Sequence, residues 1–111
     1  MQYALLIYED EQVYRSDDAD MADVVAQHRA YAAGLGPRFL SGSGLKETDS
    51  ATTVRTQGGA KTIHDGPFAE TKEQLGGFYI VEAPDLDAAI EMARNLPLYR
   101  DGSVEIRPLI G

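Results

Sequence analysis

The sequence predicts an α+β fold, an antiparallel sheet with two helices on one of its faces. Two short apolar runs, two amphipathic helical patterns and the order in which they alternate along the chain support this prediction. The chain has 111 residues, of which 43% are hydrophobic and 25% charged. That composition is typical of one globular domain, which we expect to span residues 1–111.

The first element is a strand at residues 3–8 (YALLIY), because a short continuous apolar run is typical of a strand buried on both faces. Residues 9–20 are acidic and polar, which predicts a loop. Near its end, Ser16, Asp17 and Asp18 offer oxygens that can cap the following helix.

The first helix is predicted from a stripe of residues at helical spacing. Gly34, Gly36 and Pro37 end this helix. The residues expected to face the core are Met21, Val24, Val25, His28, Ala32 and Leu35.

A glycine-containing strand at residues 39–45 (FLSGSGL) and a hairpin follow. The hairpin joins residues 52–56 to residues 61–64 through the turn signal Gly58-Gly59. Its polar and apolar residues alternate, so one face should contact water. We therefore expect the hairpin at a sheet edge or over a pocket.

The second strand with two apolar faces is residues 78–83 (FYIVEA). Asp85 is the expected N-cap of a second helix, which ends before Pro97. Residues 103–109 alternate and predict a final strand. The residues expected to face inward from the second helix and the last strand are Leu86, Ala89, Ile90, Ala93, Val104 and Ile106.

This order of elements is that of a ferredoxin-like fold, in which both helices cover one face of an antiparallel sheet. Residues 3–8 and 78–83 are nevertheless apolar on both faces. A monomer would leave a large apolar surface in water, which folded monomers rarely do. The sequence therefore predicts a homodimer in which a second copy covers the other face.

The formal charge of −8 argues against nucleic acid and anionic membrane surfaces as partners. The chain has no cysteine, which excludes disulfides and thiolate chemistry. Neither a signal peptide nor a membrane span is recognisable, so we expect a cytoplasmic protein. Neither histidine lies at metal-ligand spacing and no nucleotide-binding motif is present, so we predict no metal and no cofactor.

The sequence DGPF at residues 65–68 is a turn with candidate binding residues. Asp65 can accept backbone N–H bonds, Gly66 permits a positive φ, and Phe68 should anchor the turn in apolar surroundings. A carboxylate held in this way suits catalysis or ligand binding, and a structural turn is the alternative.

Residues 70–73 (ETKE) add two carboxylates, a hydroxyl and an amine beside this turn. They form either a solvated loop or the polar rim of a pocket, in which Thr71 and Lys72 would hold the oxygens of a ligand.

His28 lies on the inward stripe of the first helix. A histidine there is either a hydrogen-bonded core residue or a general base. A carboxylate bonded to one ring nitrogen would leave the other nitrogen as the base, and Asp65 is the candidate for that carboxylate.

The segment DGPFAETKEQLGGFYIVEAPDLDAAIEMA resembles the DGPF-motif branch of the YCII-related proteins. The start YALLIY, the helix AQHRAYAAGL and the end SVEIRPL extend the resemblance over almost the whole chain. It implies a ferredoxin-like, dimeric α+β barrel with a pocket in which His28 and Asp65 form an acid–base pair. Some members of this branch accompany sigma factors of the extracytoplasmic-function type.

Two functions are consistent with these observations. The first is small-molecule binding in a pocket with His28, Asp65, Gly66, Phe68, Thr71 and Lys72, with acid–base catalysis on a small polar or aromatic substrate. The second is a non-catalytic dimeric sensor or accessory protein, linked to sigma-factor-type transcription regulation. The substrate is not encoded in any motif of the sequence.

Overall fold

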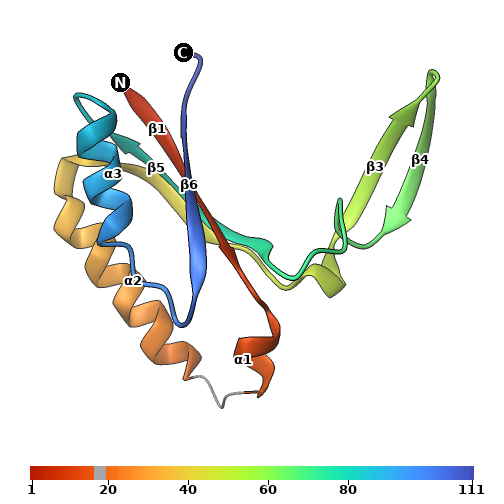
Figure 1. Cartoon of the computed structure of the whole chain (residues 1–111), viewed down its shortest axis with the longest axis horizontal. Coiled ribbons are helices and arrows are strands. Elements are labelled where there is room, and N and C mark those ends of the chain that lie inside the picture. The colour runs from red at the N-terminus through yellow and green to blue at the C-terminus, as the bar shows by residue number, and fades with distance from the viewer. Residues whose placement is uncertain (17–19) are drawn as a thin grey trace.

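The computed structural model describes residues 1–16 and 20–111 of the chain (Figure 1). Two single 3-10 turns, η1 (Gly36–Arg38) and η2 (Thr48–Ser50), accompany the helices and strands. In chain order these are β1 (Gln2–Glu9), α1 (Gln12–Ser16), α2 (Met21–Leu35), β2 (Phe39–Gly44), β3 (Thr52–Gln57), β4 (Ala60–Asp65), β5 (Gln74–Glu82), α3 (Leu86–Arg94) and β6 (Gly102–Pro108).

Four strands form an antiparallel sheet in the order β2-β5-β1-β6. Helix α2 connects β1 to β2, and α3 connects β5 to β6, so each helix crosses over one intervening strand. Both helices lie on the same face of the sheet (Figure 1). The predicted ferredoxin-like α+β fold is confirmed.

The core lies between this sheet face and the two helices. Alternation along β1 turns Tyr3, Leu5 and Ile7 toward the helices, and all three are buried. From β5, Tyr79 and Val81 join them, and Leu5 and Val81 have no exposed surface. The predicted inward residues Val104 and Ile106 pack against this cluster from β6.

Neither α2 nor α3 covers the opposite face of the sheet (Figure 1). Leu6 of β1 lies opposite Phe78 of β5, and Ala4 lies opposite Ile80. Leu6, Phe78 and Ile80 are only half-buried within one chain. Both central strands are therefore apolar on two faces, as predicted.

The first helix differs from the prediction in its cap and in its inner face. The cap is Asp20, which accepts from the N–H groups of Ala22 and Asp23; Asp17 and Asp18 lie outside the described residues. Met21 and Val25 were wrongly expected in the core, since their side chains are 52% and 43% exposed. The core contacts of α2 come from its C-terminal half, which contributes Tyr31, Ala32 and Leu35.

Two further boundaries differ. The predicted loop at residues 9–20 contains the short helix α1, whose first N–H is accepted by Asp10 Oδ1 at 3.0 Å. Strand β5 begins at Gln74, four residues before the predicted start. Asp85 caps α3 through Ala88 N–H at 2.9 Å, as predicted.

The predicted hairpin forms, but it is not at an edge of the main sheet. Within the described residues, strands β3 and β4 pair only with each other, and they extend away from the sheet on the side opposite the helices (Figure 1). The edges of the main sheet are β2 and β6.

Among the described residues, no helix is both long and apolar enough to span a membrane. The cytoplasmic location stays a prediction.

Two glycines test this packing in opposite directions. Gly34 lies in α2 with no atom near an added Cβ, so Gly34→Ala should raise stability by about 0.4–1 kcal/mol. At Gly42 of β2 an added Cβ would lie 2.9 Å from Tyr79 Cδ1 and 3.0 Å from the Phe78 carbonyl oxygen. Gly42→Ala should therefore lower stability. Urea unfolding of the two variants measures both changes, and a stabilised Gly42→Ala would contradict this packing.

Candidate functional site

A polar hollow of about 550 Å3 lies where the hairpin joins the rest of the chain. Its walls come from three separate segments, namely α1 with the two residues before it, the η2 turn, and the DGPF turn with the residues after it. The lining residues are Asp10, Glu11, Gln12, Arg15, Thr48, Asp49, Asp65, Gly66, Pro67, Glu70, Thr71, Lys72 and Gln74.

The DGPF turn is fixed by two hydrogen bonds to the start of β3 and the residue before it. Gly66 N–H donates to the Ala51 carbonyl at 2.8 Å, and Thr53 Oγ1 donates to the Gly66 carbonyl at 2.7 Å. Gly66 has φ of +138°, which residues with a side chain rarely adopt. An added Cβ would also lie 3.0 Å from His64 Nε2. The glycine of the motif is thus required by the backbone.

The opposite wall is held by a carboxylate that bridges two distant segments. Glu11 accepts the N–H and the hydroxyl of Thr48, both at 2.8 Å. Arg15 donates to the Glu47 carboxylate at 2.9 Å from one terminal nitrogen. These contacts tie α1 to the η2 turn and leave the hollow open between them and the DGPF turn.

Four charged side chains in the hollow have no hydrogen bond or ion pair among residues 1–16 and 20–111: Asp49, Asp65, Glu70 and Lys72. The Asx-turn alternative for Asp65 would need its carboxylate to accept a backbone N–H, and no such bond is present in this part of the chain. Thr71 Oγ1 donates to the Glu73 carbonyl at 2.7 Å, so its hydroxyl can only accept from a ligand. Three carboxylates and one ammonium are therefore available to a bound molecule.

Phe68 does not anchor the turn in apolar surroundings, and that expectation was wrong. Its side chain is 78% exposed, and the Arg55 guanidinium lies 5.7 Å from the ring centroid. Arg55 also donates to the Phe68 carbonyl at 2.9 Å. Phe68 does not line the hollow of a single chain, and its role in ligand binding stays a prediction.

His28 has a partner that the sequence did not identify. Its Nδ1 lies 2.7 Å from the Tyr79 hydroxyl, and the two rings stack with their centroids 5.9 Å apart. The Tyr79 hydroxyl also lies 3.4 Å from the His28 carbonyl. If the hydroxyl donates to that carbonyl and accepts from Nδ1–H, Nε2 is left as a base. Tyr79 faces the core because side chains alternate along β5, and His28 lies on the inward stripe of α2. The sequence was therefore compatible with a contact between them.

Burial lowers the pKa of His28, and the charge of Glu9 opposes this shift. The imidazole is therefore neutral near pH 7, as a general base must be. Burial likewise raises the pKa of Tyr79, so its phenol stays protonated.

Within one chain the predicted site residues lie in two groups. Asp65, Gly66, Thr71 and Lys72 line the hollow together, and His28 contacts Tyr79 and does not line it. The pairing of His28 with Asp65 stays a prediction.

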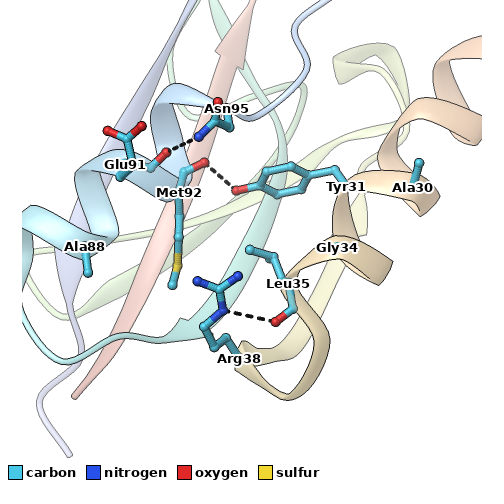
Figure 2. A pocket seen from close by; sticks show the side chains of 9 residues that line it. All are labelled: Ala30, Tyr31, Gly34, Leu35, Arg38, Ala88, Glu91, Met92 and Asn95. Atoms are coloured by element: carbon cyan, nitrogen blue, oxygen red, sulfur yellow. Dashed lines mark hydrogen bonds between the residues drawn. The ribbon is translucent and has the colours of Figure 1, made fainter.

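A second hollow, a groove of about 490 Å3, lies between α2 and α3 (Figure 2). Tyr31 reaches across it and donates to the Met92 carbonyl at 2.6 Å. Arg38 Nε donates to the Leu35 carbonyl at 3.1 Å at one end. Its lining is largely apolar and includes none of the predicted site residues, so the first hollow is the candidate site.

Groups of His, Asp and Glu close enough to hold a metal ion are absent from the described parts of the chain.

A protein-family model for the YCII-related domain matches residues 1–111. An uncharacterized protein of Rhizobium meliloti (strain 1021) is 42% identical over 118 residues, which cover 98% of this chain and 92% of the relative.

The environment of His28 predicts a pH-dependent stability. Because the pKa is lower in the folded chain than the ordinary value of 6.5, the unfolded chain binds the proton first as the pH falls. The contribution of neutral His28 to the free energy of unfolding is complete above about pH 6.5. It is lost as the pH falls through the pKa of His28 in the folded chain. Urea unfolding between pH 8 and pH 5 should show a shallower loss in His28→Gln than in the native chain.

Tyr79→Phe is the matched control, because it removes the hydroxyl and keeps the aromatic ring beside His28. It should keep the loss of stability toward low pH. Equal slopes in the native chain and His28→Gln would contradict the assignment to His28.

Proposed function

The chain belongs to the YCII-related family, and on that premise we propose that it binds a small polar molecule in the hollow beside Asp65. The observation that carries this proposal is the combination of a hollow of about 550 Å3 with four charged side chains that have no hydrogen bond or ion pair among the described residues. Small-molecule sites in proteins have volumes of roughly 300–1,000 Å3 and a few convergent polar groups.

The charges of the hollow indicate the chemistry of the ligand. Lys72 suits an anionic oxygen, whereas Asp65 and Glu70 suit a hydrogen-bond donor or a cationic group. Thr71 adds an acceptor, because its hydroxyl hydrogen is used by the Glu73 carbonyl. We therefore infer a ligand that carries both an acidic and a donor group.

Acid–base catalysis is a narrower part of the proposal. It is supported by the lowered pKa of His28, which favours the neutral imidazole, and by the free carboxylate of Asp65. In this scheme His28 moves the proton, and Asp65 orients either the substrate or the imidazole.

We also propose that the chain acts as a homodimer, with the uncovered faces of the two sheets against each other. The half-buried Leu6, Phe78 and Ile80 support this arrangement. Burial of a large apolar side chain is worth roughly 1.5–3 kcal/mol, which favours association of two such faces.

The alternative function is a non-catalytic dimeric accessory protein, for which a role beside sigma factors stays an expectation. The contact of His28 with Tyr79 favours it, because a histidine that lies outside the hollow has a structural role. In that case ligand binding or partner binding would continue after the loss of His28.

The ligand proposal predicts that a small zwitterionic or anionic metabolite raises the melting temperature of the chain. Lys72→Ala and Asp65→Asn should each weaken binding about ten- to a hundred-fold, because each removes a charge-assisted hydrogen bond. A thermal-shift screen followed by calorimetric titration measures both effects.

Lys46→Ala and Asp101→Asn are the matched controls, since both residues are exposed outside the hollow. They should keep native affinity. A ligand bound equally well by all four variants would place its site elsewhere.

The dimer proposal predicts that Ile80→Glu yields a folded monomer, because it puts a charge in the centre of the uncovered face. Val25→Glu is the control, since it makes the same kind of change on the exposed side of α2. Sedimentation at micromolar concentration measures the oligomeric state. A native chain that sediments as a monomer would contradict the proposal.

A further inference from the structure

The hairpin of β3 and β4, which we call the arm (residues 52–65), has no supporting surface among residues 1–16 and 20–111. All residues of β4 are exposed, and in β3 only Thr53 is half-buried. The arm extends well away from the sheet, and the radius of gyration is 15.6 Å (Figure 1), compared with about 13 Å for a compact chain of similar length. A two-stranded hairpin alone is at best marginally stable in water. The arm therefore needs a surface from outside this chain.

One face of the arm is suited to docking. In the β3–β4 register Val54 lies opposite Ile63, and these side chains are 61% and 77% exposed. Arg55 lies opposite Thr62 on the other face. Directly opposed β-branched residues form one continuous patch on a strand pair. The apolar patch is thus confined to one side of the arm.

The charge of the arm is opposite to that of the rest of the chain. The arm contains two basic residues, Arg55 and Lys61, and one acidic residue, Asp65. Since the whole chain has a formal charge of −8, the arm carries +1 and the remainder −9. The arm is therefore attracted to an acidic surface, such as the rest of the chain outside the arm in a second copy. We call this remainder the body.

The body of a second copy also offers the apolar complement. Its uncovered sheet face carries Leu6, Phe78 and Ile80, and acidic side chains such as Glu82 and Glu105 lie on the strands at that face. The arm extends on the same side as this face (Figure 1). A twofold axis that brings two such faces together would place each arm beside the other copy, and would close the assembly.

We propose that each arm docks through Val54 and Ile63 onto the body of a second copy of this chain. The two copies then exchange arms symmetrically, and Lys61 lies against acidic groups of the partner. This arrangement adds contacts between the arm and the partner to the contact between the two sheets.

Arm docking also bears on the hollow, a consequence that rests on the proposed function. Thr53 and Arg55 of the arm donate to the carbonyls of Gly66 and Phe68 in the DGPF turn. An arm held by the partner therefore holds this wall of the hollow in place.

The test compares the double variant Val54→Thr/Ile63→Thr with Thr62→Val. The double variant keeps β-branched residues and removes the apolar patch, whereas Thr62→Val adds an apolar group to the other face of the arm. Sedimentation equilibrium should give a dimer dissociation constant about tenfold higher for the double variant and unchanged for Thr62→Val. Lys61→Glu should weaken the dimer at low salt, with the loss reduced at 0.5 M salt.

A second measurement locates the arm directly. The chain has no cysteine, so Ile63→Cys can carry a single photo-crosslinker. In a mixture of isotope-labelled and unlabelled chains, crosslinks should join labelled to unlabelled peptides. A dimer with native affinity in the double variant, or crosslinks only within one chain, would overturn the proposal. Metabolite binding is measured separately in the thermal-shift screen. A negative result for arm docking therefore does not decide the ligand proposal.

Discussion

The burial of one face of β1 and β5 under α2 and α3 is the interaction on which the rest of the structure depends. Leu5 and Val81 are fully buried at its centre, with Tyr79 beside them. The same two strands alternate, so burial of this set sends Leu6 and Phe78 to the uncovered face. The half-exposed apolar face is thus a direct consequence of how the core is built from these strands.

The sequence predicted those parts of the fold that depend on local pattern. Apolar runs identified β1 and β5, Asp85 identified the start of α3, and Gly58-Gly59 identified the hairpin turn. Helix α1 was missed because five mostly polar residues have no periodicity to detect. Of the two expected positions of the hairpin, the one at an edge of the main sheet was wrong, since alternation reports which residues share a face and not what lies against that face.

The candidate site was predictable only on one of its walls. The DGPF turn could be recognised because glycine at positive φ and a neighbouring carboxylate leave a local signal. The other wall depends on Glu11 and Thr48, which are 37 residues apart and bond through side chains that follow no motif. The contact of His28 with Tyr79 is of the same kind, because it joins residues 51 apart.

The arm and the hollow share one base, and this is why neither can be understood alone. The η2 turn leads into β3, and the DGPF turn leaves β4, so two of the three walls of the hollow are the two ends of the arm. Gly66 N–H donates to the Ala51 carbonyl and closes this base. A displacement of the arm is therefore transmitted to Asp65 through a hydrogen-bonded ladder of only six residue pairs. A partner that holds the arm would fix the position of the carboxylate, and a ligand that holds the carboxylate would in turn favour the docked arm, since such coupling is reciprocal.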